Sequence, residues 1–338
     1  MVVTIKHIAK KAGVDISVVS RVLNNRGDEY RISKQRQSKV RKIAKSLSYS
    51  PNLSAQAIRT GRFGCAALLL SSYKDRSFLP HLVLDGIHDE LEKHDLHLLL
   101  TKLPDERPDD LSSLPKVFRT LMADGLIVNY VRELSPCLAS LIEQNESPTV
   151  WVNVKKEQDC IYSDSYRASH TATEKLIDLG HKRIAYFDFH HPDINKSGIH
   201  YSARDRFFGY RDAMSRADLK PCDVRREEID YIVKVLSQPD RPTAFVSYWS
   251  TGVPILLRAI RMAGLTVPND ISLITMAGQS NLDELCASAM IEPDHDMGRE
   301  AARMLIKKTQ DCNTIAMPSK VLQFSYVDFG TCVPLNKG

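Results

Sequence analysis

A short segment near the amino terminus, VDISVVSRVLNN (residues 14–25), places hydrogen-bonding side chains at helical spacing. Val18, Val19, Val22 and Leu23 form an apolar side that would pack against another helix. The opposite side presents Ile16, Ser17, Ser20, Arg21 and Asn24. Arginine offers a planar fork of donors, serine and asparagine both donate and accept, and isoleucine offers an apolar contact. Together these groups suit the edges of nucleic-acid bases.

Lysines and arginines are concentrated around this segment. Residues 1–62 hold 14 basic and three acidic residues, a net charge of +11, whereas residues 63–338 hold 32 and 38, a net charge of −6. A basic end on a mildly acidic remainder indicates that one end of the chain binds a polyanion. The alternative interpretation of such a charge run is a solvated basic face.

Apolar spacing and capping residues divide the basic end into three short helices. The spacing predicts a helix over residues 5–12 that stops at Gly13, and Asp15 can cap a second helix. Two short helices joined by a glycine-containing turn indicate a helix-turn-helix whose second helix enters the major groove. Ser33 can cap a third helix. The outward side of this third helix carries Lys34, Arg36, Lys39, Arg41, Lys42 and Lys45.

The segment YSPNLSAQAIRTGRFG (residues 49–64) separates the basic end from the rest of the chain. Pro51 ends the third helix, Asn52 can cap a new one, and residues 53–58 are too few for a stable isolated helix. A contact must therefore order this segment, unless it is a plain flexible linker.

From Gly64 onward, apolar strand patterns alternate with amphipathic helix patterns. The helix-like DGIHDELEKHDL (residues 85–96) followed by the strand-like HLLLTKL (residues 97–103) is one example. This alternation predicts right-handed βαβ units and parallel sheets. A second set of such units begins near residue 167, so two lobes are expected. Ligands bind such folds at the carboxyl ends of the strands, here in a cleft between the lobes.

Several protein classes are disfavoured by composition and motifs. No apolar run approaches the roughly 18 residues of a membrane span, and the amino terminus lacks an apolar signal core, so a cytoplasmic protein is expected. The seven cysteines are scattered without a C-x-x-C pair, which argues against a disulfide framework or a zinc site. His190, His191 and Asp193 suit a rim loop better than a metal site. No H-E-x-x-H, G-x-S-x-G or P-loop motif occurs. We therefore expect no enzyme, metal or cofactor.

Stretches in both halves of the chain resemble the LacI/GalR family of bacterial transcriptional regulators. They are TIKHIAKKAGV, VVSRVLNN and Y-x-P-N-x-x-A-x-x-I-R-T-G-R-x-G near the start, and ATEKLIDLGHKRIAYF, FFGYRDAM, LLRAIRMAGLTVPNDISLIT and MGREAARMLI further on. The resemblance implies a small all-α helix-turn-helix head with a hinge helix. An α/β two-lobed body with two parallel sheets would follow, with the fold of periplasmic sugar-binding proteins.

The resemblance also implies where the domains end. The expected domains are a DNA-binding domain (1–49), a hinge helix and linker (50–63), and an effector-binding and dimerisation domain (64–338). Within the last, the chain is expected to cross between lobes near 162–165, 291–295 and 322–326. Lobe 1 would then take about 64–162 and 294–323, and lobe 2 about 163–293 and 324–338.

Matching positions imply which residues contact DNA. Arg21 would read guanine beside Ile16 and Ser17. Ile58 falls where the family usually has a leucine lever, which wedges into the minor groove when two hinge segments meet. The link between the second and third helices, residues 25–32, is longer than the family's and is expected to be a solvated loop, with phosphate contacts by Arg26 and Arg31 as the alternative. The full set of expected DNA contacts is Thr4, Ile16, Ser17, Ser20, Arg21, Asn24, Lys34, Arg36, Asn52, Ala55 and Ile58.

In the body, Arg206 matches an arginine that hydrogen-bonds hydroxyls or acids of the effector in many family members. The alternative is a surface salt bridge. Asp164 keeps an acidic position that serves either ligand contact or helix capping. Trp249 would stack on a flat group or belong to the core. The expected effector contacts are Ser72, Tyr73, Phe78, Tyr130, Asp164, Arg206, Tyr248 and Trp249.

Two acidic positions of the family are absent from the second lobe. This chain has Tyr248–Thr251 and Thr275–Gly278 where the family has carboxylates that accept sugar hydroxyls. A simple neutral sugar is therefore disfavoured, and the expected effector is sugar-related or anionic.

Together these features predict a sequence-specific DNA-binding transcriptional regulator, a repressor, controlled by a small molecule in the cleft. Two copies would bind a pseudopalindromic operator in the cytoplasm, associated with the nucleoid, with a tetramer left open. Two other interpretations remain. One is a ligand-insensitive DNA-binding regulator that uses the body to dimerise, and the other is a metabolite-binding protein with a vestigial head.

Overall fold

A computed structural model describes the chain in segments. These are residues 3–49, 62–71, 77–103, 123–130, 139–140, 142, 147–189, 193–195, 198–224, 228–280, 285–310 and 316–335. Contacts divide the chain into two compact units, Met1–Phe63 and Gly64–Gly338, which we call the head and the body. None of the helices in the described segments is long and apolar enough to cross a membrane.

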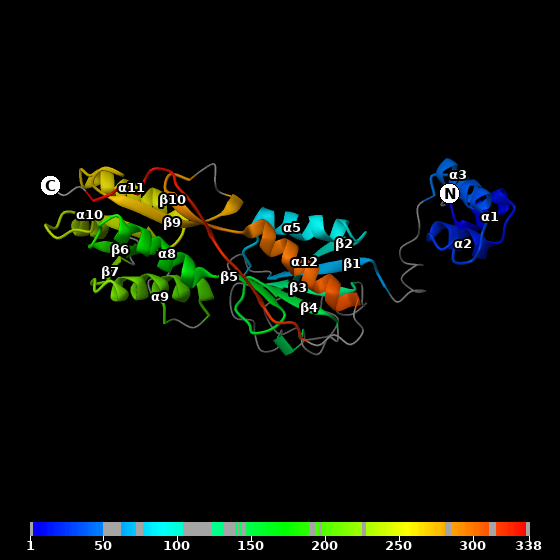
Figure 1. The fold of residues 1–338 in the computed structure, drawn as a ribbon, viewed down its shortest axis with the longest axis horizontal. Coiled ribbons are helices and arrows are strands. Elements are labelled where there is room, and N and C mark those ends of the chain that lie inside the picture. The colour runs from blue at the N-terminus through cyan, green and yellow to red at the C-terminus, as the bar shows by residue number, and fades with distance from the viewer. Residues whose placement is uncertain are drawn as a thin grey trace. The chain divides into compact units, whose positions relative to one another are not determined.

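Three helices form the described part of the head. They are α1 (Ile5–Ala12), α2 (Ile16–Leu23) and α3 (Lys34–Ser46) (Figure 1). The apolar sides of all three meet in one small core, because each helix buries residues at helical spacing. The buried members of this core are Ile8, Ala9, Ala12, Val19, Val22, Val40 and Ala44.

The helices of the head begin and end at the capping residues that the sequence predicts. Gly13 has a φ of 65°, a left-handed conformation that glycine adopts without steric cost, and it ends α1. The Asp15 side chain accepts a hydrogen bond of 2.8 Å from the backbone N–H of Ser17 and caps α2. The Ser33 side chain caps α3 by accepting a longer bond of 3.4 Å from the backbone N–H of Arg36.

The first sheet of the body is parallel throughout, in the order β11-β5-β4-β3-β1-β2. Its strands are β1 (Cys65–Ser71), β2 (His97–Leu103), β3 (Gly125–Asn129), β4 (Thr149–Val152), β5 (Cys160–Ser163) and β11 (Lys320–Leu322). Helices α5 (His81–Glu92) and α12 (Asp294–Gln310) pack side by side against it (Figure 1). Gly86 and Gly298 leave no room for a side chain where the two helices meet, so their backbones approach closely.

The second sheet has the order β12-β10-β9-β8-β6-β7. Its strands are β6 (Ile184–Phe187), β7 (Cys222–Val224), β8 (Ala244–Ser247), β9 (Ser272–Gly278), β10 (Ser288–Glu292) and β12 (Ser325–Val327). Its helices are α8 (Ser165–Asp178), α9 (Tyr201–Arg216), α10 (Ile229–Leu236) and α11 (Val253–Met262), with a short 3-10 turn, η2 (Ser250–Gly252). The edge strand β12 runs antiparallel to β10, which differs from the expectation of purely parallel sheets.

The chain passes between the two sheets at three places. It leaves the first sheet after Ser163, returns after Glu292, and leaves again after Leu322. Because β3 and β4 of the first sheet and β10 of the second end near these passages, polar residues at those strand ends can share one site.

The strongest local patterns correspond closely to observed elements. The strand expected over residues 97–103 is β2, whereas the helix expected over residues 85–96 begins and ends four residues earlier, as α5. The short strands β5, β7, β11 and β12 were not expected from their pattern, because three or four residues carry little periodicity.

Candidate nucleic-acid interface and effector site

The outward side of α2 presents the residues expected to meet bases. Ile16 is 40% exposed although it is apolar, and Ser17 and Arg21 are exposed beside it. Val19 and Val22, on the opposite side, are fully buried in the core of the head. The core therefore holds α2 rigidly while Ile16, Ser17 and Arg21 remain accessible.

Three other expected DNA contacts are engaged in local hydrogen bonds. Asn24 donates from Nδ2 to the backbone oxygen of Ser20 at 2.7 Å and so closes the end of α2. Thr4 begins α1, where its backbone N–H donates to Nδ1 of His7 at 3.1 Å. These contacts give Thr4, Ser20 and Asn24 a structural role at helix ends.

Arg21 stacks on an aromatic ring that the sequence alone did not single out. Its guanidinium carbon lies 4.0 Å from the centroid of the Tyr30 ring, and that of Arg26 lies 5.3 Å from the same ring. Arg26 also donates to the Tyr30 hydroxyl at 3.3 Å and pairs with Glu29 at 2.8 Å. A cation over a ring face is attracted by the ring quadrupole, so Tyr30 favours one orientation of Arg21.

The long link over residues 25–32 is a largely solvated loop, as expected, and it is also held against α3. Gln37, which is 4% exposed, donates from Nε2 to Asp28 and to the backbone oxygen of Ile32, both at 2.8 Å. Lys34 pairs with Asp28 at 2.7 Å. Hydrogen bonds from Lys34 and Gln37 hold the pKa of Asp28 below its usual range. This network fixes the loop that carries Tyr30.

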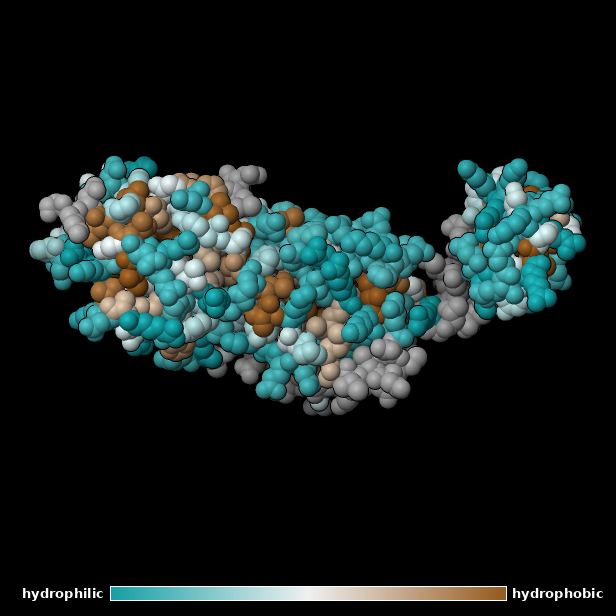
Figure 2. All heavy atoms as spheres, viewed as in Figure 1, coloured by the Kyte–Doolittle hydropathy of each residue, from teal (hydrophilic) through white to brown (hydrophobic). Residues whose placement is uncertain are grey.

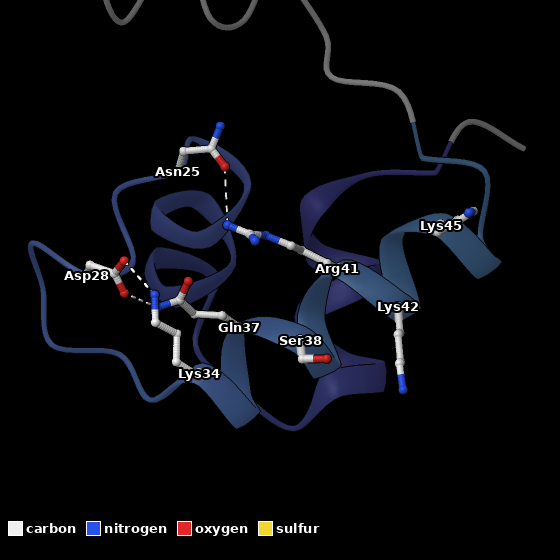
Figure 3. Close-up of a pocket in the computed structure, with 8 residues that line it drawn as sticks. All are labelled: Asn25, Asp28, Lys34, Gln37, Ser38, Arg41, Lys42 and Lys45. Atoms are coloured by element: carbon white, nitrogen blue, oxygen red, sulfur yellow. Dashed lines mark hydrogen bonds and ion pairs between the residues drawn. The ribbon is translucent and has the colours of Figure 1, made fainter.

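A groove lies between this loop and α3, and four of its eight lining residues are cations (Figure 3). Its lining residues are Asn25, Asp28, Lys34, Gln37, Ser38, Arg41, Lys42 and Lys45. Lys34 and Gln37 point to Asp28, Arg41 donates to Asn25 at 3.2 Å, and Lys42 and Lys45 point away from them (Figure 3). Hydrophilic side chains cover most of the visible face of the head (Figure 2). Such a surface suits phosphate groups.

In the body, Arg206 on α9 is buried rather than part of a surface salt bridge. It is 3% exposed, and it donates to the backbone oxygen of Tyr248 at 3.0 Å and to the Ser165 hydroxyl at 3.3 Å. Its Nη2 lies 3.6 Å from Oε2 of Glu292. The guanidinium also contacts the rings of Tyr248, Trp249 and Phe324, with centroids at 4.9, 4.8 and 5.7 Å.

Two acidic residues that the sequence did not single out line a narrow cavity beside this arginine. Glu292 ends β10, and Asp294 begins α12. The cavity, which we call the acidic cavity, is lined by Phe78, Asn129, Asn153, Glu292, Asp294 and Met297, among others. Carboxylates therefore do reach this site, but from positions other than the two where the family usually has them.

The two carboxylates have different surroundings. Glu292 accepts a hydrogen bond from the Ser163 hydroxyl and faces Arg206. Burial, together with the negative charge of Glu292, raises the pKa of Asp294 from 3.8 to about 7. The charges of Glu292 and Arg206 offset each other. The Asp294 carboxyl, with a pKa of about 7, instead changes its charge near neutral pH.

The other expected effector contacts lie in three places: at the acidic cavity and Arg206, in the core of the first sheet, and at the start of α8. Phe78 lines the acidic cavity, and Tyr248 and Trp249 contact Arg206. Tyr130 is 1% exposed and packs in the core of the first sheet. Asp164 caps α8 by accepting from the backbone N–H of Arg167 at 3.0 Å, the structural alternative considered for it.

Comparison with known proteins identifies the family. A model of the bacterial regulatory proteins of the lacI family matches residues 4–52, and a model of the periplasmic binding protein-like domain matches residues 173–327. The probable HTH-type transcriptional regulator EndR of Paenibacillus polymyxa is 26% identical over 322 residues, 91% of each chain. The HTH-type transcriptional repressor PurR of Vibrio vulnificus is 25% identical over 332 residues, 91% of this chain and 92% of that relative. The chain belongs to the LacI family.

The fold of this LacI-family chain is also that of a solved family member. A crystal structure of the Lac repressor dimer bound to operator and the anti-inducer ONPF matches it with a TM-score of 0.75 at 20% identity. The match covers 98% of this chain and 100% of that one. The predicted helix-turn-helix head and two-sheet body are thereby confirmed. The chain is a DNA-binding transcriptional regulator with an effector-binding body, and its relatives are regulators rather than enzymes.

Some expected site residues of this LacI-family chain fall outside the described segments. They are Asn52, Ala55 and Ile58 of the hinge and Ser72 and Tyr73 of the body; His190 and His191, which were expected in a rim loop, also lie outside these segments. Asp193 is described, and it accepts a hydrogen bond from the backbone N–H of Asn195 at 2.9 Å. The described segments contain no group of three or more potential metal ligands.

Proposed function

We propose that two copies of this chain repress transcription by binding the two half-sites of a pseudopalindromic operator. The observation that carries this proposal is the recognition side of α2, where Ile16, Ser17 and Arg21 are exposed on a helix held by a buried core. The similar Lac repressor was solved as a dimer on its operator, and PurR is named a repressor. The first supports a dimer on the operator, and the second supports repression over activation.

Affinity and specificity are proposed to come from different residues. Lysines and arginines of α3 neutralise phosphates and release counterions, so affinity falls as salt rises. Arg21 donates to the two acceptors of a guanine, which gives sequence preference. Hinge residue Ile58 is proposed to wedge into the central base step, where it bends the operator. The proposed domains are a DNA-binding domain (1–49), a hinge (50–63) and an effector-binding domain (64–338).

The effector is proposed to act through the ends of the strands that meet at the acidic cavity. Its binding would favour one arrangement of the lobes and thereby shift the population between operator-bound and released copies. Glu292 is suited to such coupling, because it ends β10 of the second sheet, contacts Arg206 of α9, and accepts a hydrogen bond from the Ser163 hydroxyl at the end of β5 in the first sheet. The regulator would act in the cytoplasm, where the chromosome lies.

Selection of bound genomic fragments by the full chain tests the DNA-binding part of this proposal. We expect one palindromic consensus to be enriched, with binding that weakens steeply between 50 and 200 mM salt, as is typical of several phosphate contacts. Ile58→Ala should reduce bending and affinity while the body stays folded, and Leu53→Ala is a control within the same segment. A chain that shows no sequence preference even in dilute buffer would overturn the proposal.

A metabolite panel in a thermal-shift assay tests the effector part separately. We expect at least one small polar metabolite to raise the melting temperature of the body, and the same compound to alter operator affinity. A chain that binds DNA but responds to no metabolite would be a ligand-insensitive regulator that uses its body to dimerise. A chain that binds a metabolite but no operator would have a vestigial head.

A further inference from the structure

The acidic cavity contains buried acceptor atoms without hydrogen-bond donors. Oδ2 of Asp294 and Oδ1 of Asn129 have no partner within the described segments. Both residues are more than nine-tenths buried, with Asp294 2% and Asn129 1% exposed. A buried acceptor left without a donor costs free energy, so such pairs of atoms are rare unless a ligand or a buried water supplies the donors.

The orientation of Asn129 is fixed, which makes its free atom an acceptor. Its Nδ2 donates to the backbone oxygen of Phe78 at 2.9 Å, so Oδ1 is the atom left without a partner. Asn129 ends β3, whereas Asp294 begins α12. Two acceptors from separate elements thus line the same cavity, and both require a donor.

The charges of the site favour a cation over an anion. Both charged residues among the described lining residues are acids, Glu292 and Asp294. Arg206, the nearby cation, already pairs with Glu292 and donates to Ser165 and Tyr248, so few of its donors are left for an anionic ligand. Asp294 interacts with the same Arg206, so two acids share one cation, and the carboxyl also accepts backbone hydrogen bonds from Gln279 and Ser280.

We propose that the acidic cavity binds the ammonium group of a small organic amine, which donates to Asp294 and Asn129 and pairs with the carboxylate charge. This inference rests on the proposed function, because it names the class of effector that this body would bind. The cavity has a volume of about 10 Å³, enough for one ammonium-sized group, so the carbon chain of the amine would lie outside it, beside Phe78, which is 54% exposed. An anionic effector, by contrast, would face two acids.

Matched pairs of amines and alcohols test the proposal with the full chain and without DNA. The probes are ethanolamine against ethylene glycol and putrescine against 1,4-butanediol, with glucose 6-phosphate as the anion and all samples at equal ionic strength. Binding is measured by thermal shift and calorimetry at pH 8. We expect both amines to bind at least tenfold more tightly than their alcohols. Equal binding of amine and alcohol, or tighter binding of the anion, would overturn the proposal.

A matched pair of variants assigns the binding to this cavity. Asp294→Asn keeps the shape but removes the charge, and it should weaken amine binding at least tenfold. Asp296→Asn removes the same charge two residues later, where the carboxylate is exposed and pairs with Arg299 at 2.8 Å, so it should change binding less than twofold. Similar losses in the two variants would mean that amines bind through the general negative charge of the body, and the cavity would be excluded.

The pH dependence of binding gives an independent measurement. Asp294 must lose its proton to pair with an ammonium group, and the charged groups that act on it are Glu292 on β10 and Arg206 on α9. Amine binding should therefore weaken about tenfold between pH 8 and pH 6. Asp294→Asn should abolish this dependence. A natural chain whose affinity does not change over this range would contradict the proposal.

Operator binding is measured separately and without amine. A chain that selects an operator but does not distinguish amines from alcohols refutes the amine proposal and leaves the regulator intact. A chain that binds amines but selects no DNA refutes the proposed regulator and leaves the amine site intact.

Discussion

Cations on the helices of the head are exposed, whereas the arginine at the candidate site of the body is buried. In the head, Arg21, Arg36 and Lys42 are exposed on helices whose apolar sides are buried. In the body, Arg206 is buried, and its guanidinium contacts Glu292 and three aromatic rings. Exposed cations are free to meet a polyanion whose phosphates lie outside the protein. A buried and paired cation instead shapes a site, and leaves neighbouring acceptors for the ligand.

The energetic consequences differ in the same way. Exposed ion pairs contribute about 0 to 1 kcal/mol to stability, because water and salt screen them. Removing one partner of a buried pair leaves an uncompensated charge in a poorly solvated place, and costs far more. Removing a buried charge of the body should therefore alter stability, whereas removing an exposed charge of the head should alter DNA binding and leave the fold intact.

The largest effect is expected for Arg206→Ala. It leaves Glu292 buried without its cation and removes the hydrogen bond to Tyr248, so we expect the free energy of unfolding to fall by about 3 to 5 kcal/mol. Chemical denaturation of the full chain, followed by circular dichroism, measures this. Arg211→Ala, an exposed arginine on the same helix, should change it by less than about 0.5 kcal/mol. Equal effects of the two variants would place Arg206 at the surface.

A somewhat smaller effect on the free energy of unfolding is expected for Asp294→Asn, and this effect depends on pH. The folded chain raises the pKa of this carboxyl from 3.8 to about 7, so between these pH values the folded state binds the proton more tightly than the unfolded state. This group therefore destabilises the fold progressively as pH rises from about 4 to 7, by up to about 4 kcal/mol. Asp294→Asn should be more stable than the natural chain at pH 8.

The difference in stability between Asp294→Asn and the natural chain should shrink as the pH falls toward 4, because the Asp294 carboxyl then holds its proton. Unfolding midpoints measured between pH 5 and pH 8 test it, with Asp296→Asn as the control in the same helical turn. A stability difference that stayed constant over the whole range would show that Asp294 titrates near its ordinary pKa.

The helices of the head could be predicted because their signals are local. Gly13 and Asp15 determine their helix ends through contacts within a few residues. The strand over residues 97–103 likewise shows its character in its own apolar run. By contrast, the antiparallel pairing of β12 with β10 depends on contacts between distant segments. No local pattern reveals such pairing.

The candidate sites show the same limit. The exposed positions of α2 follow from helical spacing, and Arg206 follows from a family resemblance. Glu292 and Asp294 carry no local signal, because they reach Arg206 and Asn129 through folding of segments more than 80 residues apart. The stacking of Tyr30 on Arg21 was also missed, since it depends on how the loop over residues 25–32 folds back on α3.

In the head, the largest expected effect is that of Arg21→Ala. If Arg21 donates to a guanine, its removal should cost about 1 to 3 kcal/mol of operator binding and relax the preference at one base pair in each half-site. Competition between operators that differ at single positions measures this. The fold should be unaffected, because the side chain is exposed. An unchanged base preference would show that Arg21 does not read the sequence.

A smaller effect on the same base pair is expected from Tyr30→Ala. The Tyr30 ring lies under the Arg21 guanidinium, and a partly exposed contact of this kind contributes about 0.5 to 1 kcal/mol. Tyr30→Phe keeps the ring and should retain most of the base preference. A double-mutant cycle with Arg21→Ala should show that the two effects are coupled. Additive effects would mean that Tyr30 contacts DNA independently of Arg21.

The smallest difference is expected between the effects of removing two cations at the start of α3 on DNA affinity. Lys34 pairs with Asp28 at 2.7 Å, whereas Arg36 has no ion pair within the described segments. Both variants, Lys34→Ala and Arg36→Ala, should weaken binding to all DNA sequences alike and leave the base preference unchanged.

Because Asp28 already neutralises part of the Lys34 charge, Lys34→Ala should lower the salt dependence of binding less than Arg36→Ala, whose loss should reduce the slope by about 1. The difference in affinity between the two variants should be below about 0.5 kcal/mol at moderate salt. Asp28→Asn provides the decisive comparison, since it releases Lys34 and should steepen the salt dependence. A slope unchanged by Asp28→Asn would mean that the phosphates do not contact this end of the helix.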